Sequence, residues 1–479
     1  MKRPAVGATY GARMTTAKPT SLRPIAGALA AASIGFALIQ LDVTIVNVAL
    51  PRIGAMLSAP VDALQWVVDA YALVFSSLLL SAGVLGDRFG GRRIYLAGLA
   101  IFALASLGCS VAPDAGLLIA ARALQGIGAA AMLPASLTLL NHACHHDERL
   151  RARAVGLWTA AGGVTIGAGP LIGGMLVAAA SWRLIFLVNL PLCALGWWLA
   201  ARLPEAARAP RAPHLDFAGQ VLAITALAGL TGGVIELRPL GLFHPLVIGA
   251  FVSALVAGAA FVRCEARSRA PMLPLRFFRL PSFGPAVAFG VFANLTYYGI
   301  VFVLTLYLQR VLGYDAFTAG LAYLPLTATF IVSNVASGWV MGRFGTRRPM
   351  IVGALVGAGG FALLLALGPR TPYLQMVPGF ALIPLGMGLA VPAMTTTILA
   401  SVDKSASGVA AAVLNAARQA GGAVGVALFG AFAGDAPGQV IGGLHVSALT
   451  SVAMLVIAAS LAVRGVRRGR TPATAAERA

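Results

Sequence analysis

Long apolar segments recur along the whole chain and constrain its fold more than any other feature. A helix crosses a bilayer with about 20 mainly apolar residues. Fourteen such segments can be traced, joined by short connections. They cover residues 25–50, 64–86, 94–112, 115–140, 154–178, 182–202, 217–238, 245–264, 283–308, 317–342, 350–368, 373–400, 408–432 and 443–463.

The composition supports the same class of protein. Only 10% of the residues are charged and 59% are hydrophobic, whereas soluble domains carry about a quarter charged residues. Backbone groups in lipid must bond within their own segment, and these segments are too long and too continuously apolar for barrel strands. The chain is therefore predicted to be an all-α integral membrane protein with fourteen transmembrane helices.

The positive charge is distributed unevenly about these segments. The formal net charge is +20, and 28 of the 35 Lys and Arg residues lie in the two tails and the alternate loops on their side. Such residues favour cytoplasmic loops, so both termini are predicted to be cytoplasmic. We expect a multi-pass protein of the cytoplasmic (inner) membrane whose partner is the lipid bilayer. No nucleic acid is expected, because no basic face of a folded soluble domain can be found.

One loop sequence occurs twice. "GVLGDRFGGRR" at 83–93 nearly returns as "GWVMGRFGTRR" at 338–348, joining spans two and three and then spans ten and eleven. Spans 1–6 and 9–14 are therefore interpreted as two copies of a six-helix unit with spans seven and eight inserted, and such parallel repeats are typical of transporters. The expected organisation is a tail (1–24), a bundle (25–202), the inserted pair with its loops (203–282), a second bundle (283–463) and a tail (464–479).

The repeated loop is a candidate conformational latch between the two bundles. Glycines permit a tight turn, and Asp87 lies just past a helix end among arginines. A charge cluster of this kind can hold two bundles together in one state and release them in another. The alternative is an ordinary basic loop that only sets topology. The candidate latch residues are Gly83, Asp87, Arg88, Gly90, Arg92, Arg93, Arg343 and Arg347.

Ionisable residues inside the apolar spans are candidate proton-coupling groups, because they are costly there and commonly functional. Asp42 lies roughly 12 Å from the outer end of span one and Arg122 roughly 10 Å from the outer end of span four, so the two are expected to meet. Burial disfavours an ionised carboxylate and a nearby guanidinium favours it, so motion of Arg122 would drive proton uptake or release. A static ion pair is the alternative. Asp69 is a second candidate proton site or a contact for cations, or else a hydrated residue at a helix start.

Polar residues in spans nine and thirteen are candidates for a substrate cavity. Asn294, Tyr297 and Tyr298 stand among apolar residues, as expected in a pocket for an amphipathic ligand. Arg418 lies near the middle of its span with no acid one turn away. It is expected to pair across helices or face a wet cavity, where it would hold an anionic group or an aspartate; a packing role is the alternative.

Several motifs together resemble the major facilitator superfamily. The loop at 83–93 is similar to its loop 2–3 signature, except that Gly91 stands where the family has a basic residue. "LIAARALQGIGAA" (118–130) is similar to the span-four signature, and "LDVTIVNVALP" (41–51) to the span-one signature of fourteen-helix drug:proton antiporters. "GAGPLIGG" (167–174) resembles the antiporter signature of span five, with residues Gly167, Gly169, Pro170, Gly173 and Gly174.

This resemblance implies a fold and a function. The fold would be the major facilitator fold, with two six-helix bundles plus two extra central helices. The function would be export of small amphipathic compounds such as drugs, toxic cations or secondary metabolites, by alternating access and in exchange for protons. Gln125, from the span-four signature, joins the candidate substrate cavity. The alternative is a proton symporter or importer of the same fold, and a remote alternative is a sensor, channel or membrane enzyme.

The sequence predicts a transporter without enzyme chemistry. No P-loop, GxSxG or zincin helix is present, so no cofactor is expected and the proton gradient is the expected energy source. "NHACHHDER" (141–149) lacks ordered ligand spacing, so no metal site is expected. The expected partners are protons and a small-molecule substrate; accessory efflux proteins are left open.

Overall fold

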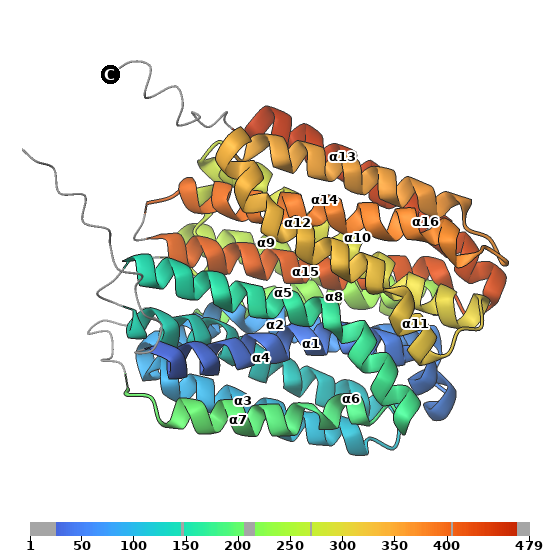
Figure 1. Cartoon of the computed structure of the whole chain (residues 1–479), viewed down its shortest axis with the longest axis horizontal. Coiled ribbons are helices and arrows are strands. Elements are labelled where there is room, and N and C mark those ends of the chain that lie inside the picture. The colour runs from blue at the N-terminus through green and yellow to red at the C-terminus, as the bar shows by residue number, and fades with distance from the viewer. Residues whose placement is uncertain (1–24, 145–147, 206–215, 269–270, 404–405, 467–479) are drawn as a thin grey trace, which may run out of the picture.

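The computed structural model describes residues 25–144, 148–205, 216–268, 271–403 and 406–466, and within these ranges the regular structure is helical. The two predicted tails lie outside the described residues, apart from 464–466. The first bundle is formed by α1 (Ala26–Leu57), α2 (Val61–Phe89), α3 (Gly91–Val111), α4 (Ala115–Ala143), α5 (Glu148–Ala179), α6 (Leu184–Leu187) and α7 (Asn189–Ala201). Figure 1 shows it as the blue-to-green half of the molecule.

The second bundle repeats this construction in the yellow-to-red half of Figure 1. It is formed by α10 (Phe283–Leu306) with the π-helical turn η3 (Tyr307–Val311), α11 (Ala316–Ala322), α12 (Leu324–Phe344), α13 (Arg347–Leu363) with η4 (Leu364–Ala366), α14 (Tyr373–Ala400), α15 (Ser407–Ala433) and α16 (Pro437–Gly465). The 3-10 helix η2 (Leu275–Arg279) precedes it.

The helix pairings confirm the internal repeat that the loop sequence indicated. In the first bundle α1 packs on α5 and α7, and α3 packs on α4 and α7. In the second, α10 packs on α15 and α16, and α13 packs on α14 and α16. Across the boundary, α2 packs on α15 and α12 packs on α5, which are equivalent contacts with the bundles exchanged. The two halves are therefore related by an approximate two-fold arrangement.

Spans seven and eight form a hairpin beside the boundary between the bundles. α8 (Phe217–Leu240) packs on α9 (Pro245–Arg267) and also contacts both α2 and α15. Trp66 on α2 donates a hydrogen bond to Glu236 (3.2 Å), and Gln220 donates to the carbonyl of Ser77 (2.8 Å). Only 11% of the apolar part of α9 is buried in the protein, so this helix presents most of its surface to lipid.

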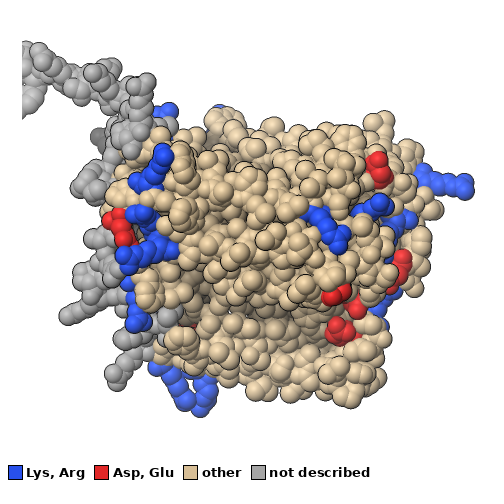
Figure 2. All heavy atoms as spheres, turned by 90° about the horizontal axis from the view of Figure 1, so that it is seen from below, with Lys and Arg blue, Asp and Glu red and all other residues tan. Residues whose placement is uncertain are grey.

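Length and hydropathy support fourteen crossings. In the described part of the chain, thirteen helical segments are long and apolar enough to span a bilayer by themselves. The remaining crossing is α15, which is rich in small residues and carries Arg418, and which lies packed between α2 and α10. Figure 2 shows that most of the middle of the visible face carries no charged side chain, as a lipid-facing surface requires.

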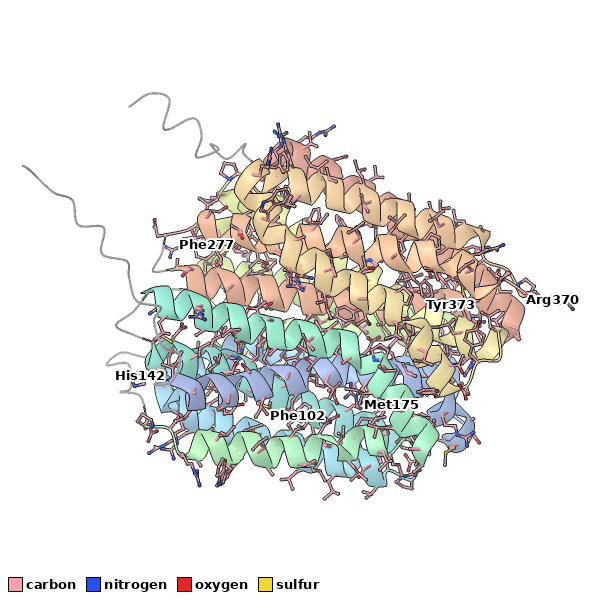
Figure 3. The ribbon with its side chains drawn as sticks, in the orientation of Figure 1. Phe102, His142, Met175, Phe277, Arg370 and Tyr373 are labelled. Carbon is pink, nitrogen blue, oxygen red and sulfur yellow. The ribbon has the colours of Figure 1, made fainter. Side chains whose placement is uncertain are left out.

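The molecule has two distinguishable ends along its helices. We call the end where α1 begins and α16 finishes the terminal end; it lies at the left in Figure 1. Figure 3 shows His142 at the terminal end and Arg370 at the opposite end. Which end faces the cytoplasm stays a prediction from the charge distribution.

Short polar signals fix where several helices begin and end. Asp114, Asp216 and Asp315 accept hydrogen bonds from backbone N–H groups three residues later, which caps α4, α8 and α11. Hydrogen bonds from Thr318 hold the pKa of Asp315 below its usual value. Gly90 and Gly345, at equivalent places in the repeated loop, have φ of 100° and 71°, a conformation that favours glycine.

Candidate functional site

A buried ion pair lies at the centre of the first bundle. Arg122 on α4 donates through Nη1 to Oδ2 of Asp42 on α1 at 2.5 Å, and the side chains are 1% and 0% exposed. The predicted meeting of these two residues is confirmed. α1 continues to Leu57, seven residues past the expected end of the span, so Asp42 stands near the middle of this helix.

Neighbouring polar groups complete the bonding of this pair. The second oxygen of Asp42, Oδ1, accepts hydrogen bonds from Gln125 (3.3 Å) and Asn189 (3.4 Å). Gln125 also accepts from Arg122 (2.8 Å) and donates to Ser106 (2.8 Å). Oδ2 of Asp42 therefore has a donor from α4 and Oδ1 has donors from α4 and α7, and Ser106 ties α3 into the same network.

The network places Gln125 beside the ion pair. This residue was expected to line the substrate cavity, but it is fully buried and both ends of its amide are occupied. Asn189 and Ser106 were not identified from the sequence. A lone asparagine in the apolar segment 182–202 is a signal that could have found Asn189, whereas nothing in the spacing distinguishes Ser106 from other serines.

Aromatic rings enclose the guanidinium of Arg122. Its carbon Cζ lies 4.4 Å from the ring centre of Tyr71 on α2 and 5.9 Å from that of Phe186 on α6, and Nε donates to the carbonyl of Val67 (2.9 Å). Cations over ring faces are stabilised by the ring quadrupole. The Tyr71 hydroxyl is buried without a hydrogen-bond partner among the described residues. Sequence reasoning missed Tyr71, which covers the ion pair on the α2 side.

Asp69 is a second buried carboxylate, on the α2 face that meets the other bundle. It is 0% exposed, and neither oxygen has a hydrogen-bond partner within the part of the chain that the structure describes. It lies one turn after Gln65, which donates to the carbonyl of Ala427 on α15 (2.7 Å), so helical spacing places Asp69 towards α15. The hydrated position considered from the sequence is wrong, because a fully buried side chain does not meet bulk water.

The second bundle contributes a different polar set around Arg418. Tyr298 on α10 lies near Arg418 on α15 and interacts with it electrostatically. Tyr298 also interacts with Tyr71 of the first bundle. Tyr297 stands edge-on to Tyr298 (5.5 Å between ring centres), and Asn294 donates to the carbonyl of Gly290 (3.1 Å). The predicted cavity residues of spans nine and thirteen are therefore neighbours, and Tyr298 lies within electrostatic range of Tyr71 on the other bundle.

The glycines of α5 allow three helices to approach closely. A Cβ on Gly173 would lie 2.8 Å from the carbonyl oxygen of Ile45 on α1, and one on Gly169 would overlap Thr44. A Cβ on Gly174 would lie 2.5 Å from the carbonyl oxygen of Ala316 on α11.

The same stretch of α5 meets the second bundle at two further residues. A Cβ on Gly167 would lie 2.5 Å from Thr327 of α12, and the carbonyl of Pro170 lies against Gly320 of α11. The expected tight contact between the two bundles at this motif is confirmed, and its sealing of the pathway against protons stays a prediction.

The bundles touch near the opposite end, and three glycines towards the terminal end lack close neighbours. Near the opposite end, Gln309 of η3 donates to the carbonyl of Val48 (2.8 Å), and Gln65 bonds across to α15. Towards the terminal end, a Cβ on Gly86 of α2, Gly156 of α5 or Gly342 of α12 would meet nothing within 4 Å. The structure is therefore closed between the bundles at the opposite end.

In this state the candidate latch residues bind within their own bundles. Arg92 donates to the carbonyl of Ala201 at the end of α7 (2.5 Å), and its counterpart Arg347 donates to the carbonyl of Val463 near the end of α16. Arg93 pairs with Glu205 at 2.7 Å.

The remaining latch residues also show no contact between the bundles. Asp87 is exposed and makes no ion pair among the described residues. Arg88 lies over the Phe89 ring, and Arg343 lies over the rings of Trp339 and Phe344. A Cβ on Gly83 would lie 4.0 Å from Cβ of Pro134 in its own bundle. A latch across the bundles stays a prediction for the other conformation.

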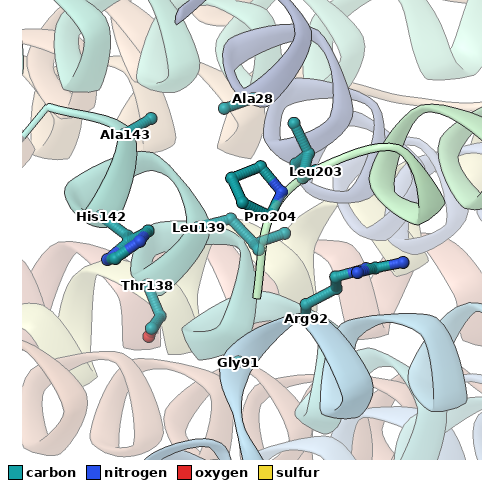
Figure 4. Close-up of a pocket in the computed structure, with 9 residues that line it drawn as sticks. All are labelled: Ala28, Gly91, Arg92, Thr138, Leu139, His142, Ala143, Leu203 and Pro204. Carbon is teal, nitrogen blue, oxygen red and sulfur yellow. The ribbon is translucent and has the colours of Figure 1, made fainter. Parts of the chain in front are cut away.

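The departure at Gly91 has a steric reason. A Cβ at this position would lie 2.8 Å from the side chain of Thr138, so α3 begins against α4 without room for a longer residue. Gly91 and Arg92 also line a hollow with Thr138, His142 and Leu203 (Figure 4). This hollow lies inside the first bundle at its terminal end, away from Asp42, and it is not the predicted substrate cavity.

No metal centre emerges in the described part of the chain, where no group of three or more His, Cys, Asp or Glu residues could hold an ion. His145, His146 and Asp147 of the histidine-rich loop lie outside the described residues.

Comparisons with known proteins agree with this arrangement. The sequence model of the "Major Facilitator Superfamily" matches residues 32–426. A "Methylenomycin A resistance protein" of Bacillus subtilis (strain 168) is 38% identical over 400 residues, covering 83% of this chain and 85% of that protein. "Multidrug efflux pump LfrA" of Mycolicibacterium smegmatis is 32% identical over 403 residues, covering 84% and 80%.

One solved structure resembles the whole molecule. It is described as "Structural insights into substrate recognition in proton dependent oligopeptide transporters" and matches with a TM-score of 0.65, covering 91% of this chain and 98% of that one. Its sequence identity is 14%, so the likeness concerns the fold alone.

Proposed function

Since this chain belongs to the Major Facilitator Superfamily, we propose that it exports amphipathic drug-like compounds from the cell in exchange for protons. The chain is a multi-pass transporter of the cell membrane and not an enzyme. Its relatives include proteins named for resistance to methylenomycin A and for multidrug efflux, which supports export of such compounds. The observation that carries the proton-coupled part is the buried Asp42–Arg122 pair inside the first bundle.

The proposed mechanism begins with competition for Asp42. Arg122 and a proton both neutralise this carboxylate, and a buried carboxylate requires one of them because an isolated charge is costly away from water. When Arg122 lies 2.5 Å away, Asp42 is held as the ionised partner. A shift of α4 relative to α1 would remove the guanidinium, and Asp42 would then take up a proton.

Motion of the bundles supplies the second half of the cycle. The structure is closed at the opposite end by the α5–α11 and α2–α15 contacts, and opening this end requires those contacts to separate. Asp42 lies on α1 three residues before Ile45, which Gly173 of α5 touches, so movement of α5 acts directly on the helix that carries the carboxylate. A proton taken up from the opposite end would then be released at the terminal end when Arg122 returns.

Asp69 fits the same scheme as a second proton site. Its oxygens lack partners among the described residues, and a protonated acid costs far less to bury than an ionised one. Because Asp69 faces α15 across the boundary between the bundles, separating the bundles would expose it to water. We assign Asp42 the primary role because a cation already stands beside it to expel the proton.

The test is exchange by purified protein in proteoliposomes with an imposed pH gradient. Asp42→Asn is expected to abolish proton movement linked to export of a dye, because asparagine cannot carry the proton. Asp114→Asn is the matched control, since asparagine also caps a helix and Asp114 lies outside the network. Exchange by Asp42→Asn at the wild-type stoichiometry would refute the assignment, and dye movement in the same direction as protons would favour the symport alternative.

A further inference from the structure

The two membrane-embedded arginines of this protein have opposite surroundings. Arg122 is bonded to Asp42, Gln125 and a backbone carbonyl, and two aromatic rings enclose it. Arg418 makes no ion pair or hydrogen bond with the described residues, and its Nε is buried without a partner. An uncompensated cation inside a membrane protein usually faces a ligand or a water-filled space.

The stem of Arg418 is fixed while its charged end is left free. A Cβ on Gly290 of α10 would lie 3.2 Å from Cγ of Arg418 and 2.8 Å from the sulfur of Met394, so the aliphatic part is held where α10, α14 and α15 meet. The side chain as a whole is partly exposed. Since the stem is packed and the guanidinium is unpaired, the terminal nitrogens are available to a molecule that enters between the bundles.

The carboxylates of the neighbouring bundle do not neutralise Arg418. Asp42 is committed to Arg122, and Asp69 makes no ion pair. The titratable group that acts on Arg418 is the phenol of Tyr298, which is a hydrogen-bond donor to an anion and carries no charge of its own. Arg418 therefore brings a positive charge that no carboxylate of the described residues pairs with.

Aromatic surface lies beside this charge. Tyr297 stacks on Phe330 of α12 with 6.2 Å between ring centres, and Tyr298 stands edge-on to Tyr297. A flat apolar ring with one negative group would place the ring against these aromatics and the group on Arg418. Guanidinium binds carboxylate through two parallel hydrogen bonds, which gives both strength and orientation.

We propose that the substrates of this transporter are amphipathic monoanions whose carboxylate binds Arg418 and whose apolar ring lies against Tyr297 and Phe330. The assignment rests on the proposed export function and names its substrate class. It also predicts that cations of similar size bind more weakly, because they would be repelled by an arginine that pairs with no carboxylate among the described residues.

The test compares three dyes that share one ring system. The probes are 7-diethylaminocoumarin with a carboxylate, a carboxamide or an aminoethyl carboxamide at position 3, which carry negative, zero and positive charge. Binding to the purified full-length protein in detergent is followed by fluorescence anisotropy. The carboxylate is expected to bind about tenfold or more tightly than the carboxamide, as for a charged hydrogen-bonded pair, and the amine is expected to bind most weakly.

Variants locate the effect at Arg418. Arg418→Gln is expected to bring carboxylate affinity down to that of the carboxamide, and Arg418→Lys to keep part of the preference, since it retains the charge without the fork. Arg370→Gln is the matched control, because Arg370 is exposed at the opposite end (Figure 3). Thermal unfolding shows whether each variant is folded, and the wild-type preference among the dyes tests the proposal without any variant.

The failures of the two proposals are distinguishable. Equal binding of the three dyes, tighter binding of the amine, no binding of any of them, or carboxylate binding that Arg418→Gln leaves unchanged would overturn the anion assignment. Export itself is measured separately, as dye movement driven by a pH gradient in everted vesicles. Export of the neutral or cationic dye by a protein that fails the binding test would leave the export function standing.

Discussion

Removing Arg122 while keeping Asp42 is expected to destabilise the protein strongly. The two side chains are 1% and 0% exposed with 2.5 Å between Nη1 and Oδ2. Replacing Arg122 by methionine keeps the apolar stem but leaves Asp42 buried without its cation, so this carboxyl group must either stay charged at a high cost or take up a proton. Breaking a buried pair in this way costs about 3–5 kcal/mol of unfolding free energy.

The companion variants turn this into a double-mutant cycle. Asp42→Asn leaves Arg122 bonded to Val67 and Gln125, so its cost is expected to be smaller, about 1.5–3 kcal/mol. The double variant has no unpaired charge, so its loss is expected to fall short of the sum by about 2–3 kcal/mol. The free energies are measured by circular dichroism during unfolding in mixed detergent micelles.

An exposed pair of similar length is the control for this cycle. Arg93 and Glu205 lie 2.7 Å apart, but their side chains are 59% and 33% exposed. Water and counterions screen such a pair, so its coupling is expected to stay below about 1 kcal/mol. If Arg122→Met and Asp42→Asn add to within about 0.5 kcal/mol, the buried pair is not energetically coupled and the reasoning from burial is refuted.

Three further outcomes are expected. Gly174→Leu should hold α5 away from Ala316 and accelerate the decay of a pH gradient across vesicles. Gly156 has open space around it, so Gly156→Leu should leave the decay rate unchanged. Equal decay rates of the two variants would argue against a seal at this motif. Export of one monoanion in exchange for one proton moves a net two positive charges into the cell, so a membrane potential of 100 mV (inside negative) should contribute about 4.6 kcal/mol per cycle to export. This is measured with a potassium–valinomycin potential at equal pH on both sides. An export rate that does not respond to the potential would contradict this stoichiometry. The pKa of Asp315 is lower in the folded protein than in the unfolded chain, where it is about 4. The cap at the start of α11 therefore stabilises the fold fully above the unfolded pKa and loses this effect as the pH falls through the folded pKa. Hydrogen exchange of the Thr318 amide should rise in that pH range in wild type but not in Asp315→Asn.

The pairing of Asp42 with Arg122 could be anticipated because helix rise converts position in the chain into depth. A carboxylate and a guanidinium at similar depth on different helices are each costly to bury alone, so they were expected to pair. This held even though α1 is longer than its apolar segment. The sequence-based segment ended at Leu50, but the helix continues to Leu57 because packing against neighbouring helices supports residues whose composition alone did not indicate a span.

The partners of the pair could not be anticipated in the same way. Tyr71 reaches Arg122, Asn189 reaches Asp42, and Ser106 reaches Gln125 only because α2, α7 and α3 pack around the pair. Gln125 was assigned to the substrate cavity, whereas its position one turn from Arg122 places it on the ion pair. The depth of a residue follows from its position along one helix. Contact between residues also depends on how each helix is oriented about its own axis, and only packing fixes that orientation.

The sequence by itself determined the membrane class, the fourteen crossings and the duplicated bundle, because hydropathy and loop repeats act within single segments and between neighbours in the chain. Tertiary structure alone decided that Arg92 and Arg347 bind the ends of their own bundles. It also decided that, among the described residues, Asp69 is fully buried without a hydrogen-bond partner and Arg418 makes no ion pair. These facts depend on which faces of distant helices meet, and small residues such as Gly173 and Gly290 set those distances without appearing in any charge pattern.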